Sequence, residues 1–293
     1  MNSIVAVQTL PPPPSRFASF CAFVMERKVA AIALTVLCLM ILAAVFAPWV
    51  TPYLPNKLSI PNRLKPPSAE FWFGTDEFGR DVLTRTVFAA RVSLKVGLAV
   101  VGISMAAGTV LGIIAGMSKR LDMVLSRLLD SMMAFPDILL AIALVAALGP
   151  SLNTVIIALS VVYTPRLARV VRASTLVINE LPYIEAARAL GVSTLRIAIR
   201  HILRNLISPL LVQGSFIFAY AILAEAGLSF LGVGVDPDVP TWGTMIAAGR
   251  QYSERAEWLM IYPGLAIMIA ALCLQVVGDS LRDLLDPTIQ KSL

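Results

Sequence analysis

Six long apolar blocks dominate the sequence, and charged or turn-forming segments separate them. Each block is long enough for an α-helix to cross a hydrocarbon layer of about 30 Å, which takes about 20 residues. Only 14% of the 293 residues are charged, against about a quarter in an average water-soluble domain. The blocks comprise residues 29–50, 92–117, 125–148, 152–171, 206–231 and 258–281. The sequence therefore predicts an integral membrane protein.

The blocks are continuous, which favours helices over strands. A membrane β-barrel would show short segments in which apolar and polar residues alternate, because neighbouring side chains face lipid and lumen in turn. We therefore expect an all-α integral membrane protein with six transmembrane helices. The run Val45-Phe46-Ala47 resembles a signal-peptide cleavage site, but the block 29–50 is too long for one and Pro48 would follow the cut. We expect this block to be retained as the first transmembrane helix.

The distribution of basic residues sets the expected orientation. With a cytoplasmic N-terminus, most of the 24 lysines and arginines lie on the cytoplasmic side, as the positive-inside rule requires. We therefore expect both termini in the cytoplasm. The expected organisation is a cytoplasmic tail (1–28), the first transmembrane helix (29–50), an extracytoplasmic loop (51–87), a five-helix core (88–283) with a cytoplasmic loop (173–205), and a cytoplasmic tail (284–293).

A charged, helix-forming segment covers residues 179–209, between the fourth apolar block and the start of the fifth. Pro182 suits the first turn of a helix, Gly191 can adopt the left-handed conformation that ends it, and Ser193 can cap a second helix. On that second helix we expect basic residues on one side (Arg196, Arg200, Arg204) and apolar residues on the other (Leu195, Ile199, Ile202, Leu203, Leu206). Two interpretations remain open: a docking surface for a partner in the aqueous phase, and a helix that lies on lipid headgroups.

Ionised groups inside the apolar blocks are costly to bury, so each should face protein or water. Asp130 lies three residues after Arg127, and we expect an ion pair between them. Lys95 lies one turn inside its block and should extend toward the headgroups. Glu225 has no charged neighbour within a turn of its own helix. It is the candidate for the wall of a polar pathway.

Small residues and a proline mark two further features of the spans. Gly108, Gly112 and Gly116 recur every four residues and lie on one helical face. This spacing lets another helix backbone approach closely, either within the bundle or at a contact with another subunit. Pro136 cannot donate a backbone hydrogen bond, and we expect it to kink the helix of block 125–148.

The residues that usually carry chemistry are scarce. The three cysteines, Cys21, Cys38 and Cys273, have no metal-ligand spacing and are interpreted as small core residues. The lone histidine, His201, has arginine neighbours and is interpreted as a solvated surface residue. No phosphate-binding loop, zinc-protease motif or nucleophile elbow occurs in the chain. We expect no catalytic residue, metal site or cofactor here, so any ATP must be bound by another subunit.

The stretch Glu185-Ala186-Ala187, followed by Gly191 and Leu203, resembles the EAA loop of ABC importer permeases. Further motifs resemble the C-type permease of bacterial dipeptide, oligopeptide and nickel transporters. They are residues 73–81, 90–94, 134–136, 224–232, 242–243 and 278–287. Two positions depart from the family pattern: Arg204 stands where a proline is usual, and residues 117–122 lack paired glycines.

The resemblance implies a type I ABC importer permease, with a five-helix core plus an N-terminal helix, in a bacterial inner membrane. The implied partners are a paralogous B-type permease, one or two ATPase subunits that bind ATP and magnesium, an extracytoplasmic substrate-binding protein and membrane lipid, but no nucleic acid. It assigns ATPase coupling to Glu185, Ala186, Ala187, Arg188, Gly191 and Leu203.

Dipeptides or oligopeptides are the expected substrates, because they form the broadest class in the family that the chain resembles. The alternative within the same architecture is a nickel chelate or another small solute. An ion-coupled secondary transporter would be built on inverted repeats with broken helices, and no convincing internal repeat is present. A membrane-embedded enzyme would need a nucleophile, a base or metal ligands within the spans, and the spans lack them.

Overall fold

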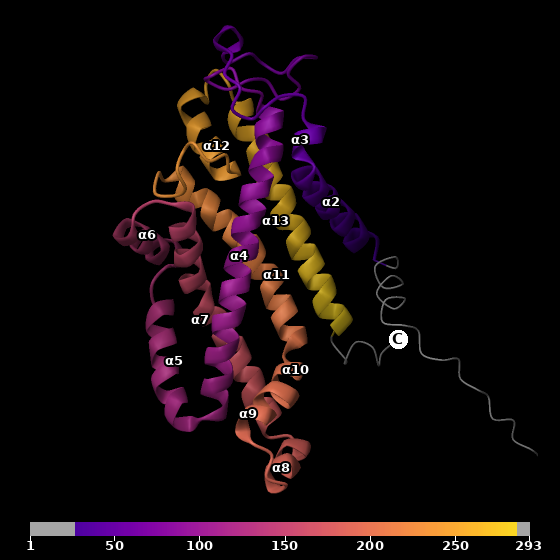
Figure 1. Cartoon of the computed structure of the whole chain (residues 1–293), viewed down its shortest axis with the longest axis vertical. Coiled ribbons are helices and arrows are strands. Elements are labelled where there is room, and N and C mark those ends of the chain that lie inside the picture. Colours follow the sequence, from indigo (N-terminus) through magenta and orange to yellow (C-terminus); the bar gives the residue numbers. More distant parts are fainter. Residues whose placement is uncertain (1–26, 286–293) are drawn as a thin grey trace, which may run out of the picture.

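The computed structural model describes residues 27–285, which form an elongated bundle of helices (Figure 1). Its elements, in chain order, are α2 (Lys28–Val45), α3 (Ala47–Val50), the short 3-10 helix η1 (Ile60–Asn62), α4 (Val82–Met117), α5 (Lys119–Met133), α6 (Asp137–Leu148), α7 (Leu152–Asn179), α8 (Pro182–Ala189), α9 (Thr194–Ile197), the π-helical turn η2 (Ala198–Ile202), α10 (Leu203–Asn205), α11 (Ile207–Phe230), α12 (Trp242–Gly249), the 3-10 helix η3 (Arg250–Tyr252) and α13 (Trp258–Leu285). Residues 1–26, which include Cys21 and most of the predicted N-terminal tail, and residues 286–293 of the predicted C-terminal tail lie outside the described residues.

Five helices of the described chain are long and apolar enough to cross a membrane: α2, α4, α7, α11 and α13. The predicted third span is divided instead into α5 and α6, which meet at an angle of 92°. Pro136 stands between them, where the missing backbone donor and the clash with the preceding residue stop the first helix. The predicted kink is therefore a complete break. Counting the bent pair as one span gives the expected six.

The helices α4 and α7 extend by two turns or more beyond their apolar blocks. The helix α4 begins at Val82, where the Asp81 side chain accepts a hydrogen bond from Thr84 N at 2.7 Å and caps the first turn. Its 36 residues rise about 54 Å, well beyond a hydrocarbon layer of about 30 Å. The helix α7 has 28 residues and continues to Asn179. Hydropathy underestimates both helices because their ends are polar.

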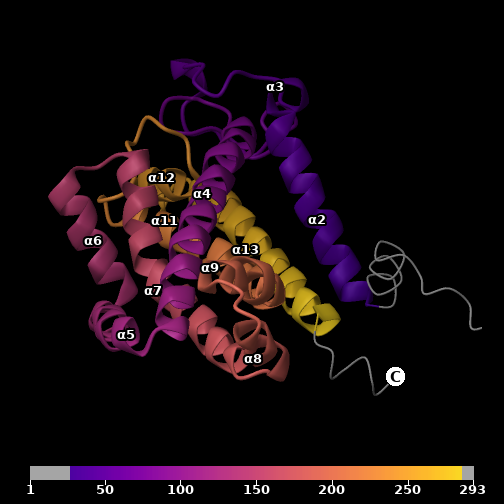
Figure 2. The same ribbon diagram turned by 60° about the horizontal axis from the view of Figure 1, so that its bottom comes forward.

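The bundle has two distinct ends (Figure 1). The segment around α3 and the helix α12 lie at one, which we term the α3 end, and α8 lies at the other, which we term the α8 end. Turning the molecule shows α2 at the edge of the bundle beside α13 (Figure 2). Arg27, which precedes α2, also forms an ion pair with Asp283 of α13.

The helices α4 and α7 pack backbone to backbone. A Cβ atom added at Gly108 would lie 2.9 Å from Leu167 Cβ, and one added at Gly116 would lie 2.6 Å from Thr175 Cβ. Both contacts are with α7, so the glycine stripe serves packing within the bundle, as one of the two interpretations proposed. Val96 and Val100 of α4 and buried residues of α7, among them Leu167 and Val171, belong to one hydrophobic cluster that continues to the α8 end.

Ion pairs fasten the broken span to α7. Asp137 Oδ2 accepts a hydrogen bond from Arg166 Nη2 at 2.7 Å. Three carboxylates of α5 and α6 pair with three arginines of α7: Asp122 with Arg172, Asp130 with Arg169, and Asp137 with Arg166. The expected pair between Asp130 and Arg127 is therefore wrong. Asp130 pairs across to the neighbouring helix instead, with Arg169 of α7.

Substitution of Gly112 tests the close approach of α4 and α7. A Cβ at Gly112 would lie 2.6 Å from Ala168 O and 2.6 Å from Val171 Cβ. Gly112→Ala should therefore lower the stability of the purified protein in detergent by about 1–3 kcal/mol. Gly102 is the matched control, because no atom lies within 4 Å of its added Cβ. Gly102→Ala should be neutral or stabilising, and equal melting temperatures of the two variants would refute the packing.

Candidate functional site

The helix α8 has well-defined ends. Pro182 occupies its first turn, as predicted. At its end, Gly191 adopts a left-handed conformation with φ of +77°. Gly191 N donates to Arg188 O at 2.9 Å, and Val192 N donates to Ala187 O at 3.0 Å. These two bonds form a Schellman motif, which satisfies carbonyl groups that the helix leaves free. The predicted stop at Gly191 is confirmed.

A single apolar residue anchors α8 to the bundle. Ile184 is fully buried and belongs to the same hydrophobic cluster as Ile197 and Ile202. The residues that the sequence marked for coupling divide by exposure: Glu185, Ala186, Arg188 and Gly191 are exposed, whereas Ala187 and Leu203 are half-buried. Leu203 packs against the hydrophobic cluster. The anchored helix thus presents charged and small side chains outward.

Polar contacts that the sequence did not reveal hold α8 against its neighbours. Arg188 donates a hydrogen bond to the Asn179 side chain at the end of α7. Asn205 Nδ2 donates to the Tyr183 hydroxyl at 3.2 Å. The Tyr183 and His201 rings lie 6.1 Å apart between centroids. His201 is therefore half-buried beside an aromatic ring, whereas a solvated surface residue was expected.

The segment after Gly191 departs from a regular amphipathic helix. Ser193 precedes α9 at the capping position, but its side chain makes no capping hydrogen bond. The π-helical turn η2 changes the register, so Leu195 and Ile199 are 71% and 59% exposed. The predicted apolar side is wrong for these two residues. The interior of the turn is formed instead by Ile197, Ala198, Ile202 and Leu206.

The departure at Arg204 has a visible consequence. The helix α10 ends at Asn205 and α11 begins at Ile207, so the chain passes into the fifth span almost without interruption.

The region around α8 exposes large apolar side chains, including Leu190, which is 84% exposed. Large apolar side chains exposed on one short segment are typical of a protein contact. We use the name "α8 surface" for Glu185, Ala186, Arg188, Leu190, Leu195 and Ile199.

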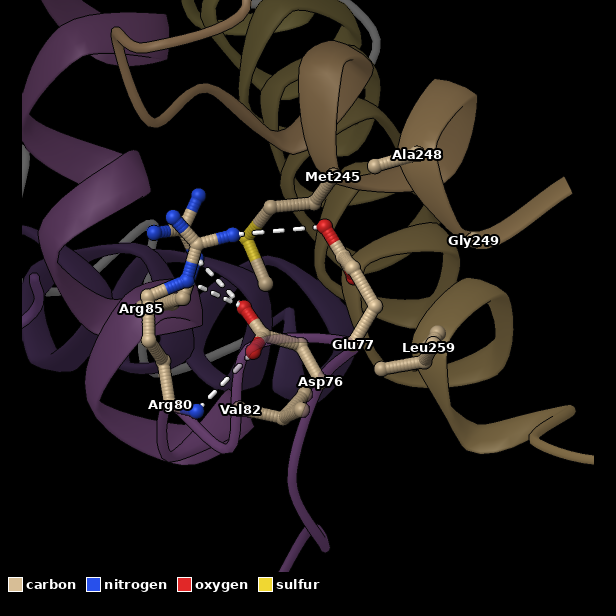
Figure 3. Close-up of a pocket in the computed structure, with 9 residues that line it drawn as sticks. All are labelled: Asp76, Glu77, Arg80, Val82, Arg85, Met245, Ala248, Gly249 and Leu259. Atoms are coloured by element: carbon tan, nitrogen blue, oxygen red, sulfur yellow. Dashed lines mark hydrogen bonds and ion pairs between the residues drawn. The ribbon is translucent and has the colours of Figure 1, made fainter. Parts of the chain in front are cut away.

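A charged cluster stabilises the opposite end of the bundle (Figure 3). Asp76 Oδ1 accepts hydrogen bonds from Phe78 N and Arg80 N, both at 2.9 Å. Its second oxygen lies 3.6 Å from Arg85 Nε. Asp76 and Arg85 are both buried, beside Met245 of α12. Since each buried charge has an opposite charge nearby, the cluster holds the start of α4 in place.

Glu225 is enclosed between α11 and α12. Its Oε1 accepts hydrogen bonds from Thr241 Oγ1 at 2.8 Å and from Ser229 Oγ at 2.9 Å. The other carboxylate oxygen has no hydrogen-bond partner among the described residues. Thr241 also caps α12, because its hydroxyl accepts a bond from Thr244 N at 3.0 Å. Glu225 therefore ties the cap of α12 to the fifth span.

A cavity of about 560 Å³ lies next to this join at the α3 end. Ser229 and Thr244 line it, whereas Glu225 does not. Charged side chains also line it: Glu77, Arg80, Arg85, Asp236 and Asp238. Glu225 therefore contacts this polar cavity only indirectly, through its hydrogen bond with Ser229 in the cavity wall.

Residues 108–291 match the family described as the inner membrane component of binding-protein-dependent transport systems. The chain belongs to this family. Residues 24–67 match the N-terminal transmembrane domain of oligopeptide transport permease C. The protein is thus a C-type permease of the ABC importer class, and the resemblance found in the sequence is confirmed.

Curated relatives of the permease cover nearly its full length. A Brucella suis protein named as a peptide transport system permease is 52% identical over 266 residues, which are 91% of this chain and 90% of the relative. The dipeptide transport system permease protein of Alkalihalophilus pseudofirmus is 42% identical over 96% of this chain and 94% of its own. The di/tripeptide transport system permease protein of Pseudomonas aeruginosa is 42% identical over 95% and 94%.

The fold of the permease also resembles a solved structure. A chain of the MetNI methionine ABC transporter, in an inward-facing conformation, superposes with a TM-score of 0.51 and 21% identity. The match covers 66% of this chain and 95% of that chain. It supports the type I importer fold of the helical core.

Thr241 offers a test of the join between α11 and α12. Thr241→Val removes both the donor to Glu225 and the cap of α12, and it should lower the stability of the purified permease by about 1–3 kcal/mol. Thr241→Ser keeps the hydroxyl and should retain most of that stability. Thermal unfolding in detergent measures both variants, and a valine variant that melts with the native protein would contradict the role of this hydroxyl.

Proposed function

We propose that this chain is the C-type permease of an importer that carries dipeptides or oligopeptides. Relatives that bear peptide-transport names match it over more than nine-tenths of its length, and its N-terminal segment matches the oligopeptide permease domain. A paralogous B-type permease completes the translocation pathway, and an extracytoplasmic binding protein delivers the peptide. The same chain architecture would serve a nickel chelate or another small solute, so the uptake experiment below compares the two classes.

The proposed orientation places the α8 end in the cytoplasm together with both termini. Basic residues gather near this end: Lys119, Arg120, Arg188, Arg196, Arg200 and Arg204. The loop from 233 to 257 at the α3 end carries Asp236, Asp238, Glu254 and Glu257 against two arginines. This asymmetry is what the positive-inside rule associates with a cytoplasmic α8 end. We further propose the division into tails, first span, outer segment 51–87, whose last six residues already belong to α4, and core 88–283.

The α8 surface is the proposed docking site for an ATPase subunit, and its exposure on an anchored helix carries the proposal. The ATPase, not this chain, binds ATP and magnesium and supplies the energy. Glu185 offers a charge to the partner, and the small side chain of Ala186 permits close approach. Closure of the ATPases on ATP then displaces α8, which the Arg188–Asn179 bond connects to the end of α7.

Movement of α7 reaches the rest of the permease through its packing on α4 and its ion pairs with α5 and α6. Packed helices shift as units between discrete arrangements. We propose that the permease alternates in this way between inward-open and outward-open states. Glu225 supports the pathway wall in this scheme, because its partner Ser229 lines the cavity at the α3 end.

Gly191 provides the sharpest test of coupling. Its added Cβ would meet no atom within 4 Å, so only the left-handed backbone opposes a side chain. A residue with a branched side chain pays at least about 1–2 kcal/mol there, and Gly191→Val should reduce uptake about tenfold or more. Asparagine tolerates this conformation, so Gly191→Asn should transport nearly normally.

Uptake of labelled dipeptide and of labelled nickel is measured in cells that express the complete importer, and the ATPase rate is measured in proteoliposomes with the binding protein. We expect the native importer to take up peptide. In Gly191→Val, uptake should be lost although the subunit is still in the membrane. Normal transport and normal substrate-stimulated ATP hydrolysis in that variant would contradict the coupling role. Nickel uptake without peptide uptake would replace the substrate class and leave the coupling test intact.

A further inference from the structure

A groove with apolar walls separates α2 from the core near the α3 end. It encloses about 420 Å³. Its lining comes from three helices: Ile41, Ala44 and Val45 of α2, Arg91, Leu94, Lys95 and Leu98 of α4, and Phe218 of α11. Two of these eight residues are cations and the remaining side chains are apolar. An occupant must therefore combine apolar bulk with negative charge.

Within the described part of the chain, the two cations have no acidic partner. Arg91 and Lys95 are exposed and take part in none of the ion pairs found between residues 27 and 285. They lie four residues apart on α4, so they are neighbours on one face, and like charges at this spacing repel. A shared anion would remove the repulsion.

The depth of the cations in the membrane identifies the kind of anion. Lys119 and Arg120 are the first residues of α5, just beyond the end of α4, and we take these two cations as the headgroup level at the α8 end. At 1.5 Å per residue, α4 rises about 33 Å between Met117 and Lys95. A hydrocarbon layer is about 30 Å thick. Lys95 and Arg91 therefore reach the phosphate level of the other leaflet, with the apolar part of the groove on the hydrocarbon side.

We propose that this groove binds a phospholipid with a net negative headgroup. The phosphate bridges Arg91 and Lys95, and an acyl chain lies between α2 and α4 against Phe218. A helix from another subunit would fill the apolar part but would bring no anion to the cations. A zwitterionic headgroup would add its own cation beside them, so anionic lipid is preferred. Bound lipid would then join α2 to the core.

Photolabelling of the assembled importer in lipid bilayers tests the proposal. One probe is phosphatidylglycerol with a diazirine on its acyl chain, and the other is phosphatidylcholine with the same labelled chain. We expect the anionic probe to label peptides that contain residues 41–45 and 94–98, and to do so in preference to the zwitterionic probe. In Arg91→Gln/Lys95→Gln this preference should fall on the order of thirtyfold, about fivefold for each cation.

The matched control is Lys119→Gln/Arg120→Gln, which removes two cations from the opposite headgroup level. Its labelling of the groove should equal that of the native permease. Equal labelling by both probes, or unchanged preference in Arg91→Gln/Lys95→Gln, would overturn the proposal. So would labelling by neither probe, combined with a cross-link from Lys95 to the second permease.

A second variant keeps the test valid if the charge variant fails to assemble. Leu98 lines the groove and is 65% exposed, so Leu98→Trp should fill the groove without disturbing the core or the cations. Loss of labelling at residues 41–45, with both permeases and the ATPases still eluting as one complex, is the expected result. Undiminished labelling of these residues in the tryptophan variant would overturn the site.

Discussion

The close approach of α4 and α7 is the contact on which the other features depend. Glycines on α4 let the two backbones meet, and the paired helices form the axis of the bundle. The broken third span is fastened to α7 by its ion pairs. The far end of α7 leads into α8. A stiff pair of helices thus connects the α8 end to the α3 end of the permease.

The α8 surface and the α3 end differ in how they are stabilised. Ile184 and the Schellman motif at Gly191 hold α8 firmly while its outward side chains remain exposed. At the α3 end, buried polar groups contact one another, as in the Asp76–Arg85 ion pair and the hydrogen bond from Thr241 to Glu225. The first arrangement leaves side chains of α8 free, as the proposed docking requires, whereas the second fixes the start of α4 and the cap of α12 through polar contacts.

Features determined by the local chain could be predicted from the sequence. The ends of α8 follow from Pro182 and Gly191, and five of the spans follow from their apolar blocks. Features that depend on distant residues could not. Asp122 pairs with an arginine 50 positions away, and the π-helical turn that exposes Leu195 has no simple sequence signal. The coupling role of Glu185 and the pathway role of Glu225 stay predictions.

Cross-linking from α8 tests whether the α8 surface contacts an ATPase subunit. Ala186→Cys, in a chain without Cys21, Cys38 and Cys273, is labelled with a maleimide photo-cross-linker in the assembled importer. We expect a covalent product between this chain and the ATPase subunit, and the yield of that product should change when ATP is bound. Leu58→Cys, exposed at the α3 end, should give none. Failure of Ala186→Cys to capture a co-purifying ATPase, or equal capture from Leu58→Cys, would contradict the account.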